Sequence, residues 1–256
     1  MAELARSFGQ IAAEYDAVRP EYAPEAVARA KEALGLGPQA RVVDLAAGSG
    51  TLTRALTQLF TDVVAIEPDE DMRAVLAHRL PAVELLTGTA EHIPLPDASA
   101  EAVFVADAFH WFDGSKAIAE FDRVLRPGGG VALLWNLWWN DGADGTSDSL
   151  DPPLPAAARA LFDDVYVRSG RAAARGEKAD PVVSFEDSVF GRPAMELFER
   201  RRRLSGAEVL DLYATVSAVA SLPVAERDAL KREVAPLLGT AYDLTITTVL
   251  YWARRG

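Results

Sequence analysis

Residues 42–51 read Val-Val-Asp-Leu-Ala-Ala-Gly-Ser-Gly-Thr, and this stretch decides the fold. Its first residues are mostly apolar, as in a buried strand, and Gly48 and Gly50 then form a turn from which a helix starts at Thr51. Because glycine has no Cβ, a ligand can approach the backbone of such a turn closely. The stretch predicts a strand, a ligand-binding turn and a helix, in that order.

The same alternation of strands and helices extends along the chain. Apolar runs predict seven strands, at Val42–Ala46, Val63–Ile66, Val83–Leu86, Ala102–Ala106, Val131–Trp135, Ala194–Leu204 and Leu244–Ala253. Helices are predicted from Pro24 and near Thr51, Glu70 and Ser115. This order predicts an α/β fold, namely a Rossmann-like, doubly wound, mostly parallel sheet of seven strands with helices on both faces.

The regular alternation of strands and helices stops after the fifth predicted strand. Residues 140–181 begin with a stretch rich in Asp, Gly, Ser and Pro, and they contain a predicted helix at Ala156–Ser169. We expect them to form an insertion or lid over the functional edge of the sheet, because long loops in compact domains are usually functional or disordered. The region Glu208–Leu238 is predicted to be helical and split at Pro223.

Composition narrows the class of protein. The 256 residues are 50% hydrophobic, include no cysteine and carry a net charge of −12. The missing cysteines exclude disulfides and thiolate metal sites, and the negative charge makes a nucleic-acid partner unexpected. The longest apolar run, Val131–Trp139, is far shorter than the roughly 20 residues of a membrane-spanning helix. With no signal-peptide pattern at residues 1–10, we expect a cytoplasmic protein with no membrane partner and no metal.

Two common classes of glycine-rich turn do not match. A P-loop needs a lysine after its last glycine, and no lysine lies between Lys31 and Lys116. The dinucleotide pattern Gly-x-Gly-x-x-Gly fails as well, because Thr53 stands where the third glycine belongs. Glu67 follows Gly48 by 19 residues, at the end of the second strand, where a carboxylate can accept both ribose hydroxyls. These features indicate a nucleoside ligand without naming it.

The segment Asp44-Leu45-Ala46-Ala47-Gly48-Ser49-Gly50 resembles the first motif of class I S-adenosylmethionine-dependent methyltransferases, usually Asp/Glu-x-Gly-x-Gly-x-Gly, with Ala46 in place of the first glycine. Further segments match in order. Ile66-Glu67-Pro68 resembles the family's ribose-binding turn, residues 88–96 its adenine-binding segment and residues 121–129 the helix and turn before the fifth strand. Phe8–Asp16, with Arg19-Pro20, resembles the N-terminal lid of small-molecule methyltransferases related to the quinone-pathway and trans-aconitate enzymes.

The resemblance implies one methyltransferase domain over residues 1–256, with residues 1–23 as an N-terminal lid segment, and S-adenosyl-L-methionine as the cofactor. It implies methyl transfer to an O, N or C atom of a small-molecule acceptor. The alternative is a protein that binds S-adenosylmethionine for a non-methylating reaction or as a binding module. A monomer and a homodimer are both open. The implied cofactor-binding residues are Tyr15, Arg19, Asp44, Ala46, Gly48, Gly50, Glu67, Pro68, Met72, Thr89, Ala90, Glu91 and Asp107.

Candidates for chemistry follow the fourth and fifth strands. Asp107 ends the fourth strand and is either a cofactor-side acceptor or a cap for the next turn. His110 is the candidate general base, and a packed histidine bonded to backbone is the alternative. Trp111, Trp138 and Trp139 are candidate walls of a substrate pocket for an apolar or aromatic acceptor.

Overall fold

The computed structural model describes residues 18–137, 154–168 and 181–256. Contacts divide the chain into two compact units. One unit comprises residues 1–20, 137–178 and 199–247, and the other comprises residues 21–136, 179–198 and 248–256. We call the first the helical unit and the second the sheet unit, and each is described by itself.

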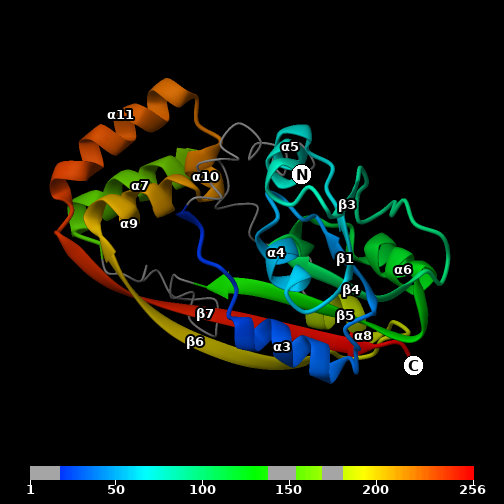
Figure 1. Ribbon diagram of the computed structural model, residues 1–256. Helices are drawn as coiled ribbons and strands as arrows, with labels where there is room; N and C mark the ends of the chain where they lie inside the picture. Colours follow the sequence, from blue (N-terminus) through cyan, green and yellow to red (C-terminus); the bar gives the residue numbers. More distant parts are fainter. Residues whose placement is uncertain (1–17, 138–153, 169–180) are drawn as a thin grey trace. The chain divides into compact units, whose positions relative to one another are not determined.

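The described strands form a seven-stranded sheet (Figure 1), as the sequence predicts. Their order is β3-β2-β1-β4-β5-β7-β6. The strands are β1 Arg41–Leu45, β2 Asp62–Ile66, β3 Glu84–Leu86, β4 Ala100–Ala106, β5 Leu125–Leu137, β6 Ala194–Ser205 and β7 Ala241–Arg254.

The first five strands pair in parallel, and β7 runs antiparallel to β5. Near the start of β5 the Gly129 carbonyl accepts the Arg255 N–H, while near its end Asn136 accepts the Thr248 hydroxyl. The mostly parallel, doubly wound sheet is therefore confirmed. Its strand order reverses between β1 and β4, and ligands of such sheets bind in the crevice at the carboxyl ends of the strands there.

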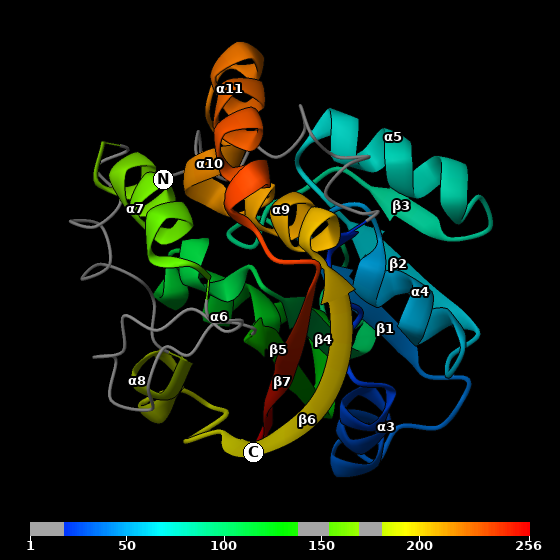
Figure 2. The same ribbon diagram turned by 90° about the vertical axis from the view of Figure 1, so that its left-hand side faces the viewer.

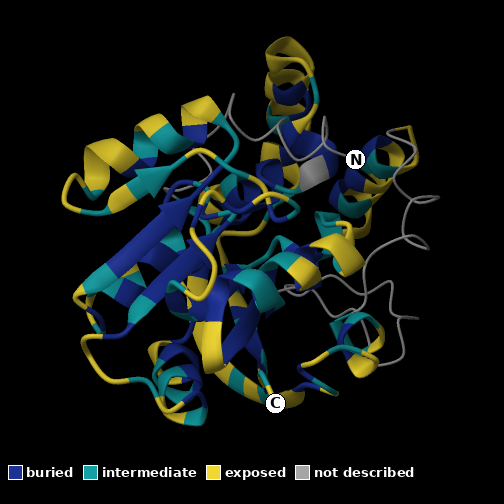
Figure 3. Cartoon of the chain, turned by 90° about the vertical axis from the view of Figure 1, so that its right-hand side faces the viewer, coloured by how far each residue is buried: buried dark blue, intermediate teal, exposed yellow. Residues whose placement is uncertain are grey.

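Helices of the sheet unit cover both faces of its sheet. They are α3 Pro24–Ala33, α4 Thr51–Thr57, α5 Glu70–Arg79, the short η2 Phe109–Trp111, α6 Gly114–Val124 and α8 Pro181–Glu186. Val42 packs in a cluster with residues of α3 and α4, whereas its neighbour Val43 packs in a second cluster with residues of α6 and α8. This alternation explains why the strands are apolar at successive positions, and Figure 3 shows them largely buried.

The start of β5 differs from the sequence prediction. The strand was expected from Val131, but it begins at Leu125, which pairs with Ala100. The next ladder pair is Ala102 with Gly130, so residues 126–129 loop out of the register. Gly128 lies in this loop with a φ of +78°, a conformation that favours glycine. The predicted turn is thus an interruption within a longer strand.

The helical unit has its own apolar core. Its described helices are α7 Ala156–Arg168, α9 Gly206–Ala214, α10 Ser217–Ala220, α11 Val224–Val234 and the short η4 Ala235–Leu237 (Figure 2). Phe162 of α7 stacks on Tyr213 of α9, with ring centroids 5.0 Å apart. Helix α7 confirms the helix that was predicted inside the insertion. The predicted break at Pro223 is also present, because Pro223 is the N-cap of α11. Across the described residues, no helix combines the length and apolar character needed to cross a membrane.

Candidate functional site

The glycine turn leaves β1 at the reversal point of the sheet. Ala46, Gly48 and Gly50 all have left-handed backbones, with φ of +57°, +57° and +91°. Gly50 is the N-cap of α4, and a Cβ at this position would lie 2.9 Å from Leu76 Cγ of α5. A side chain at Gly50 would therefore clash as well as strain the backbone.

Ala46 stands where the family motif usually has its first glycine. The positive φ at this position explains why glycine is usual there. A non-glycine residue in the left-handed region costs about 1–2 kcal/mol, part of which the lower unfolded-state entropy of alanine offsets. We predict that Ala46→Gly raises the free energy of unfolding by about 1 kcal/mol and the melting temperature by about 3 °C. Ala47→Gly is the matched control, because φ of Ala47 is not positive; it should lower both quantities. An Ala46→Gly variant no more stable than Ala47→Gly would contradict the assignment of strain.

Glu67 joins the glycine turn to the turn after β2. Its Oε2 accepts the Gly48 N–H at 2.8 Å, and its Oε1 accepts the Asp69 N–H at 2.9 Å. The residue is only 6% exposed, and burial raises the pKa of its carboxyl despite these two hydrogen bonds. Each oxygen keeps a second lone pair. Glu67 can therefore accept hydroxyl donors from a ligand while it holds both turns.

Asp44 lies beneath the turn as a second buried acid. Its Oδ2 accepts the Thr53 hydroxyl at 2.6 Å, and the residue is 1% exposed. Burial raises the pKa of Asp44 to about 7, and repulsion from Glu67 adds to the increase, while the Thr53 hydrogen bonds oppose it. Two buried carboxyls with raised pKa values favour a ligand that brings positive charge.

Hydrogen bonds to backbone groups order both the turn after β2 and the candidate adenine loop. The Asp69 side chain caps α5 by accepting the Met72 N–H, and Arg73 donates to the Pro68 carbonyl. Thr89 pairs with His92 across an antiparallel bridge. This bridge brackets the other two predicted adenine contacts, of which Ala90 is buried and Glu91 accepts the Asp113 N–H at 2.9 Å.

Asp107 follows β4 and contacts a tyrosine that sequence reasoning missed. Its φ is +54°, its N–H donates to the Leu134 carbonyl, and its Oδ2 accepts the Tyr22 hydroxyl at 2.8 Å. The two residues are 85 positions apart, so no local pattern links them. The contact gives Asp107 a fixed orientation at the reversal point of the sheet.

His110 lies in η2 among aromatic side chains. Trp135 donates its indole N–H to His110 Nδ1 at 3.4 Å, and the His110 ring centroid lies 4.8 Å from that of Trp111. In a neutral ring that accepts at Nδ1, the proton resides on Nε2. The contact is long for a hydrogen bond and therefore weak, so it biases the tautomer without fixing it.

Four further predicted residues lie in the helical unit or outside the described residues. Arg19 belongs to the helical unit and donates to the side chain and the carbonyl of Thr215, at 3.0 and 2.9 Å. Tyr15, Trp138 and Trp139 lie outside the described residues. The sheet unit thus brings together the predicted residues of the glycine turn, the ribose turn, the adenine loop and the end of β4.

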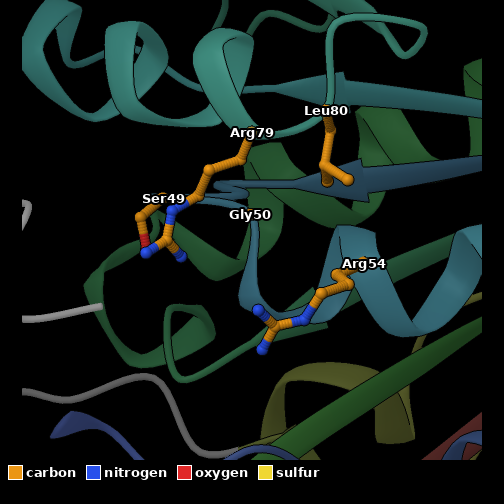
Figure 4. A pocket seen from close by; sticks show the side chains of 5 residues that line it. All are labelled: Ser49, Gly50, Arg54, Arg79 and Leu80. Carbon is orange, nitrogen blue, oxygen red and sulfur yellow. The ribbon is translucent and has the colours of Figure 1, made fainter. Parts of the chain in front are cut away.

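A pocket of about 240 Å³ opens beside the glycine turn, lined by Ser49, Gly50, Arg54, Arg79 and Leu80. Figure 4 shows the Arg79 guanidinium directed toward Ser49. Arg54 forms an ion pair with Glu21 at 2.6 Å. The lining includes neither Glu67 nor Asp107, so this pocket adjoins the candidate site only through the turn itself.

Comparisons with known proteins agree with this geometry. Residues 43–133 match a family model described as a methyltransferase domain. An uncharacterized methyltransferase of Mycobacterium bovis is 46% identical over 134 residues, covering 52% of this chain and 54% of the relative. An uncharacterized methyltransferase of Schizosaccharomyces pombe is 27% identical over 264 residues, covering 97% of this chain and 96% of the relative.

A solved structure from Anaeromyxobacter dehalogenans, of a protein assigned as a type II methyltransferase, is similar to this chain with a TM-score of 0.59 and 21% identity. The match covers 92% of this chain and 97% of that one, and it shows the shared fold. The chain spans about half the length of the mycobacterial relative that it matches. Residues 43–133 are thus similar to a methyltransferase domain, the relatives that the chain matches are named methyltransferases, and the sheet has the fold of a solved methyltransferase structure.

Proposed function

We propose that the chain transfers a methyl group from S-adenosylmethionine to a small-molecule acceptor. The observation that carries the proposal is Glu67, whose buried carboxyl braces the glycine turn and keeps acceptor capacity for ribose hydroxyls. Asp44 adds a second buried acid close to the same turn. These two buried acids fit the cofactor, which combines a ribose diol with a cationic ammonium and a cationic sulfonium.

The bound cofactor supplies an electrophilic methyl group, and transfer is a direct displacement. The contribution of the chain is then to align the acceptor at near-attack distance and to exclude water. We place the acceptor beside Asp107, His110 and Trp111, at the carboxyl ends of β4 and β5. Residues 1–23 and 140–181 stay predicted as lids, and Trp138 and Trp139 stay predicted as substrate residues.

Composition supports the proposed class of acceptor and the proposed location. The net charge of −12 supports a small-molecule acceptor over nucleic acid, because an acidic chain repels phosphates. The absence of cysteine supports a cytoplasmic location. We keep one methyltransferase domain over residues 1–256 as the proposed organisation, and a monomer or a homodimer as the proposed assembly.

The direct test is release of S-adenosylhomocysteine from purified protein with S-adenosylmethionine and panels of phenol, carboxylate, amine and carbon-acid acceptors. Acceptor-dependent release above the rate with cofactor alone supports methyl transfer. Binding of S-adenosylmethionine in a calorimetric titration without release for any acceptor class would point to a binding protein or a non-methylating enzyme. No binding in the titration would overturn the proposed cofactor site.

For His110 we predict a split between binding and turnover. His110→Ala should leave the Kd for S-adenosylmethionine within about twofold and lower turnover of phenol or carbon-acid acceptors by about 10²-fold or more, the usual contribution of a general base. To act as base at Nε2, the ring must shift its proton to Nδ1 and give up the Trp135 contact, which its length of 3.4 Å makes inexpensive.

A series of acceptors separates the two roles of His110. A base predicts that the loss in His110→Ala is large for acceptors that must lose a proton and small for carboxylates, which are already ionised. His92→Ala is the matched control, because His92 contacts the adenine loop through its backbone. Equal turnover of the wild type and His110→Ala on every acceptor would leave His110 as a packed aromatic residue.

A further inference from the structure

The candidate adenine loop, residues 88–96, follows β3 and lies beside the turn that carries Glu67. Ile66 pairs with Leu86 at the end of the β2–β3 ladder, and the Glu67 N–H donates to the Leu86 carbonyl at 3.1 Å. The strand order puts β3 and β4 on opposite sides of β2. With the ribose at Glu67 and the methyl group directed toward the end of β4, as proposed above, the base of the cofactor is placed over this loop.

Arg123 of α6 binds the far half of the loop with all of its donors. Its bonds to the two carboxylate oxygens of Glu120 are each 2.7 Å long, and its other bonds run to the carbonyls of Ile93 and Leu95, both at 2.8 Å, and to Asp97 at 2.9 Å. A guanidinium has five N–H groups, so every donor of Arg123 is used. Two of the five hold the backbone of the loop.

Glu120 holds the same stretch from the acceptor side. Its Oε2 accepts the Ile93 N–H at 2.7 Å, so one ion pair on α6 binds both backbone groups of Ile93, a residue that is 1% exposed. Hydrogen bonds from Arg123 lower the pKa of the Glu120 carboxyl, which stays ionised near neutral pH. The two bonded residues, Ile93 and Glu120, are 27 positions apart, so the contact ties the loop to a separate element.

The near half of the loop packs on the half that the ion pair holds. Thr89 and His92 form an antiparallel bridge between the two halves. A Cβ at Gly88 would lie 2.5 Å from Pro94 Cδ and 3.0 Å from Ile66 Cγ2, so the backbone of Gly88 lies against both side chains. A shift of residues 93–95 would therefore move the near half of the loop, next to the end of β2.

We propose that Glu120 and Arg123 are positioning residues, which hold the candidate adenine loop in the conformation that binds the adenine of S-adenosylmethionine. The inference rests on the proposed function. In this role the ion pair acts through the backbone of residues 93–95, while the predicted adenine contacts lie at residues 89–91. A loop that is already ordered loses little entropy when the ligand binds, so the benefit of the ion pair is preorganisation.

The test compares two ligands that differ only in the base. S-adenosylhomocysteine carries adenine, whereas S-inosylhomocysteine carries hypoxanthine, which has a carbonyl oxygen in place of the amino group. A loop with a fixed backbone distinguishes the two, because polar groups that suit one base are left unpaired by the other. In calorimetric titration the wild type should therefore bind S-adenosylhomocysteine at least tenfold more tightly than S-inosylhomocysteine.

Arg123→Lys keeps the positive charge but offers three donors on a single nitrogen, which cannot reach both carbonyls and both carboxylates. We expect this variant to bind S-adenosylhomocysteine about tenfold more weakly, because the ligand must then order the loop, and to bind S-inosylhomocysteine within about twofold of the wild type. A residue with a merely structural role would not change the preference for one base over the other.

Glu120→Gln is the second variant, because an amide has one acceptor oxygen where both carboxylate oxygens of Glu120 accept hydrogen bonds. It should show the same selective loss. Asp122→Asn is the matched control. Asp122 lies on the same helix and forms a half-buried ion pair with Arg255 Nε at 2.6 Å, so the variant also loses an ion pair of α6. Both of its affinities should equal those of the wild type.

The outcomes distinguish this inference from the proposed function. A wild type that binds neither ligand overturns the proposed function. A wild type that binds both equally well overturns the positioning role alone, and so do variants that weaken both ligands equally or neither. A selective loss in Asp122→Asn would also overturn it, because any weakened contact of α6 would then suffice. If Arg123→Lys fails to fold, the selectivity of Glu120→Gln decides.

Discussion

Replacing Glu67 with alanine will weaken binding of S-adenosylmethionine by about 10²-fold or more while the protein stays folded. The variant loses the acceptors proposed for the ribose hydroxyls, and hydrogen bonds to a charged group contribute about 1.5–3 kcal/mol each. It also leaves the N–H groups of Gly48 and Asp69 without the carboxyl that holds both turns. Since about 1.4 kcal/mol corresponds to a tenfold change in Kd, the loss of even two such bonds gives this effect.

Glu67→Gln sharpens the test. The two carboxyl oxygens of Glu67 accept from two different N–H groups, and an amide offers only one oxygen. Its NH₂ group must therefore face one backbone N–H, so the conservative variant should bind nearly as weakly as Glu67→Ala. Calorimetric titration with S-adenosylmethionine measures the Kd of both variants.

Glu84→Ala is the matched control for the Glu67 variants, because Glu84 begins β3 and forms a half-exposed ion pair with Arg41. Its Kd should equal that of the wild type. Wild-type affinity in Glu67→Ala would remove Glu67 from the cofactor site and, with it, the observation on which the proposed function depends.

Most of the sheet unit was predictable, because its signals are local. Successive apolar residues such as Val42 and Val43 pack on opposite faces of the sheet, so buried parallel strands are apparent in the sequence as continuous apolar runs. Pro24 at the start of α3 and the left-handed Gly35 after its end have equally local causes. The place of Glu67 at the end of the second strand followed from a spacing that the strand–turn–helix unit imposes, whereas its hydrogen bond to the Gly48 N–H was not predicted.

The features that sequence reasoning missed depend on contacts between distant residues. Tyr22 meets Asp107 only because the sheet brings the start of α3 beside the end of β4, and nothing within 85 residues signals it. The early start of β5 depends on the pairing of Leu125 with Ala100 across a register shift. Helix α8, Pro181–Glu186, is too short to show a helical period. The strain at Ala46 comes from its positive φ. The sequence shows that an alanine replaces the usual glycine of the motif, but it does not give the backbone angle.

The buried acid Asp44 makes the stability of the apoprotein depend on pH in a direction that can be derived. Its pKa rises from an ordinary value of 3.8 to about 7 in the folded protein. Between these values the folded state binds more protons than the unfolded state, so the contribution of Asp44 to stability is present below about pH 4 and is lost as pH rises to about 7. The full loss is roughly 4 kcal/mol, at about 1.4 kcal/mol per pH unit.

Asp44→Asn removes that titration, and we predict a protein that is more stable and binds its cofactor less well. At pH 8 its free energy of unfolding should exceed that of the wild type by about 2–4 kcal/mol, whereas at pH 5 the gain should fall by more than half, because pH 5 is only about one unit above the pKa of Asp44 in the unfolded chain. The amide oxygen can still accept the Thr53 hydroxyl. Denaturant unfolding at both pH values measures the difference, and Asp62→Asn, at a half-exposed ion pair with Arg41, should show no such gain.

The same substitution tests why a buried acid with so high a pKa lies beneath the turn. A cationic cofactor favours the ionised form of Asp44, so wild-type binding near pH 7 should release a proton, and affinity should rise with pH up to about 7. Calorimetry in phosphate and in Tris, which differ in ionisation enthalpy, should give different apparent heats for the wild type. In Asp44→Asn that difference should shrink, and S-adenosylmethionine should bind at least tenfold more weakly at pH 8. Identical heats in both buffers for the wild type would show that Asp44 does not change its charge when the cofactor binds, and its burial would then be a matter of structure alone.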